Sequence, residues 1–260
     1  MAYTHRNELA KRLRALHISG TPLLLTNAYD AASATAIASH PSTKALATAS
    51  FAIAATTGVS DPDLTLSDNL IGISRVAKVA AKHNLPLTVD LQDGYEDIAA
   101  SITQAIEAGA VGANIEDENH ATGQLRDVED AVHRIHLALT AAREAGVPDF
   151  CLNARTDVLA YGGSIDDAIE RGKRYLEAGA VTVFVWGGPK GRGVHDGEIR
   201  RLVEALDGRV NVKMNLREGY LNVNELGEMG VARVSVGPEM FWKAMEGLSR
   251  ALEDVVRKAR

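Results

Sequence analysis

Charged side chains directly follow or end several short apolar runs in this chain. Asp90 ends the run PLTVD, Glu116 ends GANIE, and Arg155 ends CLNAR. Carboxylates that lie close together repel one another unless a cation or a proton lies between them. Oxygen ligands of this kind suit Mg²⁺, which keeps several waters and takes one or two carboxylates. An arginine beside them can hold a carboxylate or phosphoryl group through two parallel hydrogen bonds. The residue types therefore predict a divalent metal and a small anionic substrate.

The same residue types also allow a purely structural interpretation. Acidic residues that follow strands often cap helices, and Asp97 and Asp127 each precede a helical pattern. A single arginine such as Arg155 can equally form a structural ion pair. Because three such residues follow three consecutive predicted strands, we favour the functional interpretation of the set over that of any one member.

The elements that must position these residues recur as an alanine-rich amphipathic stretch, a glycine and a short β-branched run. Gly109, Gly146, Gly179 and Gly230 stand where a helix would end in a left-handed cap. The runs after them lack alternation, which is typical of parallel strands buried on both faces. We expect strands near residues 23–27, 45–49, 87–91, 112–116, 150–155, 181–186, 210–215 and 233–236. We expect helices at residues 7–16, 31–39, 66–83, 97–108, 128–145, 165–178, 196–206, 223–229 and 238–260.

Eight strand-then-helix alternations in 260 residues favour an α/β protein with a single (β/α)₈ TIM-type barrel domain over residues 1–260. A Rossmann fold is disfavoured, because the first strand is followed by NAYDAASA and not by a glycine fingerprint. Functional groups of such barrels gather at the C-terminal ends of the strands. Asp90, Glu116 and Arg155 all fall there.

Composition excludes several classes of protein. A net charge of −6 argues against a nucleic-acid partner, whose phosphates require a basic face. No apolar run approaches the roughly 18 residues of a membrane span, and the N-terminal residues lack the apolar core of a secretory signal. Cys151 is the single cysteine, which excludes an internal disulfide and a cysteine cluster for zinc. We therefore expect a cytoplasmic location and neither a nucleic acid nor a membrane as partner.

At these residues the sequence resembles the isocitrate lyase/phosphoenolpyruvate mutase superfamily over most of its length. The most specific segments contain D-x-x-x-G-Y and N-I-E-D in the expected order. The matching segments are TNAYDAASA (26–34), ALATASFAIAATTGVSD (45–61), PLTVDLQDGYED (86–97), GAVGANIED (109–117), LNARTDV (152–158) and MGVARVSVGP (229–238). The resemblance implies a barrel whose eighth helix is exchanged between the subunits of a homodimer or homotetramer. It also implies Mg²⁺ or Mn²⁺ as cofactor and small α-oxyacid substrates that pass through enolate-like species.

The resemblance further implies roles for single residues. Asp90 is expected to be the principal metal ligand, and Asp61 and Glu116 to hold the metal directly or through its waters. Arg155 is expected to hold the anionic end of the substrate. The loop at Ala49, Ser50 and Phe51 is expected to supply an oxyanion hole from its backbone N–H groups. Further candidates for lining the substrate pocket at the strand ends are Asn27, Tyr29, Asn153, Trp186 and Asn215.

Departures from the family pattern bear on the reaction. Gln92 stands where the family's metal motif has a second acidic residue, and Asp93 beside it would face the opposite side. The lyases carry a K-[KR]-C-G-H loop with a cysteine acid, whereas this chain has ENHATGQL at 118–125, and Cys151 lies at the wrong end of its strand. His120 in this loop is the candidate general acid, a solvated loop histidine being the alternative. The loop is expected to close over the site.

Three functional hypotheses follow. The first is a metal-dependent lyase or hydrolase that cleaves a C–C bond beside an oxo or hydroxy acid, with Arg155, Glu116 and His120 as catalytic residues. The second is P–C bond chemistry of the phosphonomutase type, which the replacement of a phosphonyl-binding histidine by Trp186 disfavours. The third is a catalytically weak barrel that only binds a dicarboxylate. The stretch GGPKGRG (187–193) resembles a phosphate cradle in composition, but its place after the sixth strand favours a surface loop.

Overall fold

A computed structural model describes residues 3–188 and 192–259 of the chain. Its main sheet is entirely parallel, with the strand order β1-β11-β10-β9-β8-β5-β4-β3-β2. The two ends of this order, β1 and β2, are separated by Thr26 alone, so the sheet closes on itself and the predicted TIM-type barrel is confirmed. Its strands are β1 (Leu23–Leu25), β2 (Asn27–Ala28), β3 (Leu46–Thr48), β4 (Leu87–Asp90), β5 (Gly112–Glu116), β8 (Cys151–Thr156), β9 (Thr182–Val185), β10 (Val210–Lys213) and β11 (Arg233–Ser235).

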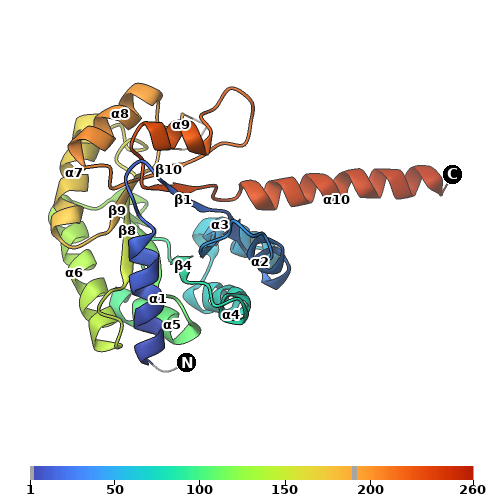
Figure 1. Ribbon diagram of the computed structural model, residues 1–260, viewed down its shortest axis with the longest axis horizontal. Coiled ribbons are helices and arrows are strands. Elements are labelled where there is room, and N and C mark those ends of the chain that lie inside the picture. The colour runs from blue at the N-terminus through green and yellow to red at the C-terminus, as the bar shows by residue number, and fades with distance from the viewer. Residues whose placement is uncertain (1–2, 189–191, 260) are drawn as a thin grey trace.

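The helices surround this barrel (Figure 1). They are α1 (Tyr3–Ala15), α2 (Ala31–Ala38), α3 (Ser50–Thr57), α4 (Leu66–Lys82), α5 (Ile98–Ala108), α6 (Val128–Glu144), α7 (Ile165–Glu177), α8 (Asp196–Ala205), α9 (Val223–Glu228) and α10 (Glu239–Lys258). The predicted helices are all present, and α1 begins four residues earlier than expected, at Tyr3 instead of residue 7. Gly109, Gly146, Gly179 and Gly230 all have positive φ, as their places after helices predict.

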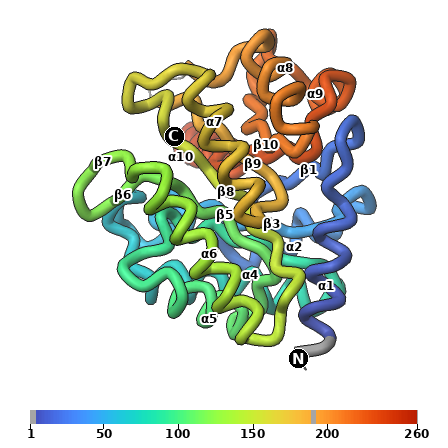
Figure 2. Tube along the Cα trace, turned by 90° about the vertical axis from the view of Figure 1, so that its left-hand side faces the viewer, coloured from blue at the N-terminus to red at the C-terminus, as the bar shows by residue number. Residues whose placement is uncertain are grey.

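Three elements were not predicted. Residues 49–51 were expected to be a loop, but Ser50 begins helix α3. A single 3₁₀ turn, η1 (Asp61–Asp63), follows it, with Pro62 inside the turn. The third is an antiparallel hairpin of β6 (Glu118–Asn119) and β7 (Gln124–Leu125). Figure 2 shows this hairpin on the side of the molecule opposite α1.

Two acidic residues that follow strands are helix caps, as the structural interpretation proposed. The side chain of Asp97 accepts a hydrogen bond from the N–H of Ala100 (3.0 Å), and that of Asp127 accepts one from the N–H of Asp130 (2.8 Å). Each satisfies a backbone donor that the helix itself cannot pair, which is worth ~1 kcal/mol of stability. These two carboxylates therefore serve the starts of α5 and α6.

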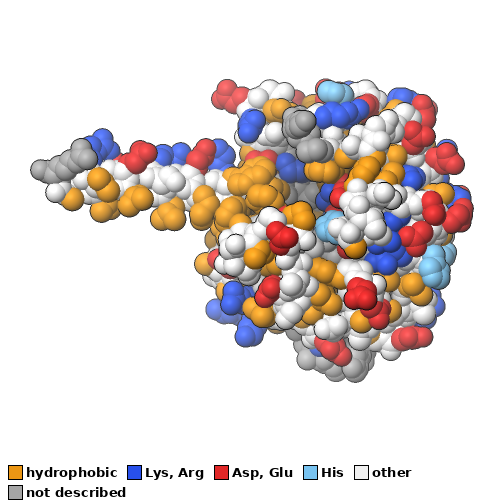
Figure 3. Space-filling model, turned by 180° about the vertical axis from the view of Figure 1, so that it is seen from behind, with side chains coloured by type: hydrophobic (Ala, Val, Ile, Leu, Met, Phe, Trp, Pro, Cys, Tyr) orange, Lys and Arg blue, Asp and Glu red, His pale blue; other side chains and the backbone are white. Residues whose placement is uncertain are grey.

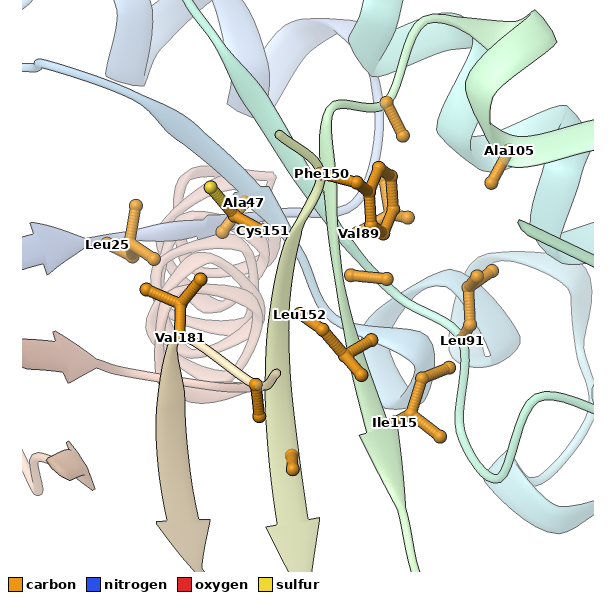
Figure 4. Packing of buried hydrophobic residues seen from close by; sticks show 14 of the residues in the cluster. Leu25, Ala47, Val89, Leu91, Ala105, Ile115, Phe150, Cys151, Leu152 and Val181 are labelled. Carbon is orange, nitrogen blue, oxygen red and sulfur yellow. The ribbon is translucent and has the colours of Figure 1, made fainter. Parts of the chain in front are cut away.

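The barrel strands place alternate side chains inside and outside. Figure 4 shows Cys151 of β8 on the side of Leu25, whereas Phe150 and Leu152 lie on the side that faces Ala105 of α5. Because side chains of a strand alternate between its two faces, every second residue of β8 after Cys151 also points inward. The outer positions are buried against the helices, and the inner positions lead up to the rim where the predicted site residues lie.

Helix α10 leaves the barrel and extends away from it (Figure 1). Aromatic contacts hold the start of the helix against the barrel rim. The ring centroids of Phe241 and Tyr29 lie 5.2 Å apart, and those of Trp242 and Phe51 lie 5.6 Å apart. One side of the helix is apolar at helical spacing (Figure 3), through Trp242, Met245, Leu248, Leu252 and Val255.

This apolar stripe is exposed, since Leu248, Leu252 and Val255 have relative exposures of 63%, 61% and 64%. On the barrel, the outward side chain of Leu24 in β1 is also 39% exposed, although its register partner Val234 in β11 is buried. Two unpaired apolar surfaces on one chain are what an exchange of α10 between copies would bring together. Within the described residues, no helix combines the length and apolar character needed to cross a membrane.

The family resemblance implies a homodimer or homotetramer. We expect the double substitution Leu248→Glu with Leu252→Glu to reduce that assembly to the mass of a single chain, because it places charges in the apolar stripe of α10. Multi-angle light scattering after size-exclusion chromatography measures this directly. Lys243→Glu with Arg250→Glu is the control, since both residues are exposed and lie off the stripe. An unchanged mass for the leucine variant would contradict the assembly through α10.

Candidate active site

Asp90 ends β4 at the C-terminal rim of the barrel and is held from several sides. Its Oδ2 accepts a hydrogen bond from the Ser50 N–H (3.1 Å), and its Oδ1 accepts one from Asn114 Nδ2 (3.1 Å). Its own backbone is fixed as well, by the Thr48 hydroxyl (2.9 Å) and by Asn69 Nδ2 (2.9 Å). The carboxylate that sequence analysis assigned to the metal is therefore set in one orientation.

The start of α3 supplies the N–H donor that meets Asp90. Ala49 occupies the N-cap position and offers no side-chain acceptor to the first turn. The unpaired N–H groups and the positive end of the helix dipole therefore face the site. Both Ala49 and Ser50 are buried, with 3% and 4% exposure. The segment expected to be a loop is thus a helix start, in which the Ser50 N–H meets Asp90 and the Ala49 N–H donates to the Ala28 carbonyl (3.3 Å).

Arg155 of β8 is fixed between two carboxylates. Its Nη1 lies 2.7 Å from Glu116 Oε2, and its Nε and Nη2 both donate to Asp157 Oδ1, at 3.0 Å and 2.6 Å. Although burial opposes it, Asp157 and Glu116 raise the pKa of Arg155, so the guanidinium is charged. The Trp186 ring centroid lies 4.5 Å from the guanidinium carbon, in a cation–π contact. Trp186 is therefore a wall beside Arg155.

His120 completes this cluster through Glu116. Its Nε2 is hydrogen-bonded to Glu116 Oε1. Burial lowers the pKa of His120, but the Glu116 hydrogen bond and charge outweigh it and raise the pKa to about 9. For Glu116, burial raises the pKa, but Arg155 and His120 outweigh burial and lower it. The result is an imidazolium–carboxylate–guanidinium row at the rim.

The segment expected to be a mobile lid is the β6–β7 hairpin, and it is tied to the barrel. Its turn is closed by the Gly123 N–H, which donates to the Asn119 carbonyl (2.8 Å). The Tyr161 hydroxyl donates to the Gly123 carbonyl (3.0 Å), and the His120 N–H donates to Asp93 Oδ2 (3.3 Å). These bonds place His120 beside Glu116 in the structure as it stands.

Gln92, which replaces a family carboxylate, acts on Asp61. It is buried with a left-handed backbone (φ 53°), and its Nε2 donates to the Asp61 carbonyl (2.6 Å) and to Asp61 Oδ1 (3.1 Å). Burial first, and then the charge of Asp90, raise the pKa of Asp61 to about 6, with a smaller contribution from Glu116. Asp61 therefore lies within the field of both other carboxylates, and Gln92 removes one repulsive charge from this group.

The donor set fits a hydrated magnesium ion better than a dry cage. Within residues 3–188 and 192–259, no three His, Cys, Asp or Glu side chains converge as a preformed metal site. Both oxygens of Glu116 are taken by Arg155 and His120. One carboxylate and several waters is a usual environment for Mg²⁺. Asp90 could hold the ion directly, with Asp61 and Glu116 reached through its waters.

Acidic neighbours of the site have structural partners. Asp93 Oδ2 pairs with Arg126 Nη2 (3.1 Å). Because β4 ends at Asp90, Gln92 and Asp93 lie in a turn, and the strand alternation expected for them does not apply. Asp117 pairs with Arg171 Nη1 (3.0 Å) and also accepts the hydroxyl hydrogen of Tyr175 (2.7 Å). These pairs tie the rim of β4 and β5 to the outer helices and leave Asp90 and Glu116 to the site.

Several pocket candidates are engaged within the protein. Asn153 is 1% exposed and donates to Asn114 Oδ1 (2.7 Å). Asn215 lies beyond the end of β10, where its Oδ1 accepts from the Arg217 N–H (2.9 Å). Asn27 donates to the Thr48 carbonyl (2.7 Å). The structure therefore brings these asparagines into backbone and side-chain contacts that stabilise the rim.

Sequence reasoning assigned no role to two residues at the rim. Asp157, which the N-A-R-T-D run places at the end of its strand, is fully buried and supports Arg155. Lys213 ends β10, where its Nζ lies 2.8 Å from Glu239 Oε1 of α10. A lysine at the tip of a barrel strand is a signal that the barrel rule itself supplies. Of the GGPKGRG stretch, residues 189–191 lie outside the described residues.

Comparison with known proteins identifies the family of this barrel. The family model described as phosphoenolpyruvate phosphomutase matches residues 13–256. The chain belongs to this family. The resemblance to the isocitrate lyase/phosphoenolpyruvate mutase superfamily is thereby confirmed.

Individual relatives carry different descriptions. A 2-methylisocitrate lyase of Escherichia coli (strain K12) is 38% identical over 47% of this chain and 44% of its own length, so the match spans less than half of that enzyme. The uncharacterized protein MT2054 of Mycobacterium tuberculosis (strain CDC 1551 / Oshkosh) is 32% identical over 85% of this chain and 80% of its own. A solved structure from Burkholderia cenocepacia J2315, provisionally described as a phosphonomutase, is 37% identical, with a TM-score of 0.85 over 96% of this chain and 99% of that one.

We expect the His120–Glu116 pair to stabilise the protein in a pH-dependent way. The pKa of His120 is raised above its unfolded value near 6.5, so its contribution is fully present below pH 6.5 and is lost as the pH rises through about 9. His120→Gln should therefore cost about 1 kcal/mol at pH 6, allowing for partial exposure, and close to nothing at pH 10. Denaturant unfolding across this range measures the difference. His136→Gln, at an exposed position of α6, is the control, and an equal cost at both pH values would contradict the pair.

Proposed function

We propose that this protein is a Mg²⁺- or Mn²⁺-dependent lyase or hydrolase. Its substrate would be a small 2-oxo- or 2-hydroxy-carboxylate, in which it cleaves a C–C bond through an enolate-like intermediate. One observation carries this proposal: Arg155, half-buried and charged, stands one strand away from Glu116 and two strands away from Asp90 on the same rim. A fixed guanidinium opposite a carboxylate able to hold a metal suits an anionic substrate that is gripped from two sides.

Each residue of the rim has a distinct part in this proposal. A divalent ion on Asp90 would supply a Lewis acid for the oxygen atoms around the bond that breaks. Arg155 keeps the N–H groups that Glu116 and Asp157 do not use, and these orient the carboxylate of the substrate. The Ser50 N–H donates to Asp90, and the N–H groups that follow it in the first turn of α3 would face the oxygen on which negative charge develops.

The proton that ends the cleavage would come from His120. When the C–C bond breaks, the hydroxyl on one of its carbons loses a proton to a base and becomes the carbonyl of one product; in a 2-oxo acid, addition of water supplies this hydroxyl. The electron pair of the bond moves into the neighbouring carbonyl or carboxyl group of the other product and forms an enolate, whose carbon then takes up a proton. Glu116 keeps His120 in the imidazolium form, which can donate that proton. This assignment gives the chain a general acid in a segment that lacks the cysteine of the lyases.

P–C bond chemistry is the second candidate, because the matching family model is described as phosphoenolpyruvate phosphomutase and the Burkholderia relative as a phosphonomutase. The two candidates are separated by incubating the protein and Mg²⁺ with oxaloacetate, 2-methylmalate-type acids or phosphonopyruvate, and following products by NMR. Turnover of a hydroxy or oxo acid that EDTA abolishes is the expected result. Conversion of phosphonopyruvate alone would favour the second candidate, and metal-dependent binding without any turnover would favour a binding protein.

We expect Asp90→Asn to abolish turnover and to weaken Mn²⁺ binding by on the order of 100-fold, because it removes the carboxylate that holds the ion. Isothermal titration with Mn²⁺ and thermal unfolding of the same samples separate lost binding from lost folding. Asp63→Asn, an exposed aspartate in η1, is the matched control. Full activity of Asp90→Asn would exclude this assignment of the metal ligand.

A further inference from the structure

An unbroken line of polar side chains crosses the barrel interior and ends at Asp90. Asn114 Nδ2 donates to Asp90 Oδ1 (3.1 Å), Asn153 Nδ2 donates to Asn114 Oδ1 (2.7 Å), and the Thr182 hydroxyl donates to Asn153 Oδ1 (2.6 Å). The four residues stand on the neighbouring strands β4, β5, β8 and β9. Each is the direct register partner of the next, so the strand alignment itself brings them together.

The direction of every hydrogen bond in this line is set at the Asp90 end. A carboxylate only accepts, so Asn114 must turn its amide nitrogen to Asp90 and its oxygen to Asn153. Asn153 must then donate from its nitrogen, which turns its oxygen to Thr182, whose hydroxyl has to be the donor. The arrangement is thus fixed by chemistry and does not depend on which amide atom is placed as nitrogen or oxygen.

The line is also sealed from solvent at its far end. Asn153 is 1% exposed and Thr182 is fully buried. The Asn153 amide cannot exchange its partners for water, and reversing it would set two donors or two acceptors against each other. Hydrogen bonds in such a chain reinforce one another in a medium of low dielectric constant. The loss of the Thr182 hydroxyl would therefore alter the hydrogen bonding of Asp90 through three successive hydrogen bonds.

We propose that Asn114, Asn153 and Thr182 are positioning residues that hold the Asp90 carboxylate in its metal-binding orientation. This inference rests on the proposed function, in which Asp90 holds the divalent ion. Asn153 and Thr182 are buried in the barrel interior, so their effect reaches the site through Asp90. Its effect is to tie Oδ1 of Asp90 to the barrel interior, so that Oδ2 stays beside the Ser50 N–H at the rim.

The test compares two threonine-to-valine substitutions inside the same barrel. Thr182→Val removes the first donor of the line at nearly constant volume. Thr88→Val is the matched control, because Thr88 is 1% exposed, shares the inner face of β4 with Asp90, and its hydroxyl has no hydrogen-bond partner among the described residues. We expect the Mn²⁺ dissociation constant, measured by electron paramagnetic resonance, to rise ~10-fold for Thr182→Val and to stay unchanged for Thr88→Val.

A variant that restores the hydroxyl, and a second pair of variants, make the result interpretable if Thr182→Val does not fold. Thr182→Ser retains the hydroxyl and should restore affinity, and if Thr182→Val does not fold, Thr182→Ala against Thr182→Ser gives the same comparison. Equal affinities for Thr182→Val and Thr88→Val would overturn the positioning role and leave the role of Asp90 standing. If Asp90→Asn itself binds Mn²⁺ like the unmodified protein, the proposed function and this inference both fail.

Discussion

The pairing of Arg155 with the buried carboxylates of Glu116 and Asp157 is the interaction on which the rest of the site depends. A guanidinium in a barrel interior is tolerated only when carboxylates accept its hydrogen bonds, and removing one partner of such a pair costs about 3–5 kcal/mol. The pairing follows from strand alignment, since Glu116 of β5 is the register partner of Arg155 of β8. A slip of one residue would turn Glu116 towards the helices. The register of β5 and β8 therefore fixes the position of the Arg155 guanidinium. Through Glu116 it also fixes the position of His120.

Much of this arrangement could be predicted because barrels obey simple rules. The glycines after helices and the unbroken apolar runs located the strands, and the position of Asp90, Glu116 and Arg155 at strand ends located the rim. Helix α3 escaped prediction, because ALATASFAIAATTG is small and apolar throughout, and such a run does not distinguish a strand from a helix. The β6–β7 hairpin escaped prediction for a different reason: its strands are two residues long, which is too short to give a sequence pattern.

Asparagine and glutamine were the residues that sequence reasoning could place but not interpret. Asn153 was assigned to the substrate pocket from its position, yet its partners are Asn114 and Thr182. Gln92 was seen as a lost charge, yet in the structure it donates to Asp61. An amide both donates and accepts, so its role depends on neighbours that lie far away in the chain. Only the three-dimensional register supplies those neighbours.

The balance of charge at the rim explains why a metal would precede the substrate. Without an ion, four carboxylates at the rim face two cations, Arg155 and His120, which gives a net charge of −2 if all six groups are ionised; the carboxylates are Asp61, Asp90, Glu116 and Asp157. An anion approaching this rim is repelled at short range, and burial strengthens the repulsion. A divalent ion brings the sum to zero and removes this net repulsion. Gln92 contributes to this neutralisation, because a further carboxylate in its place would leave the sum negative even with the ion bound.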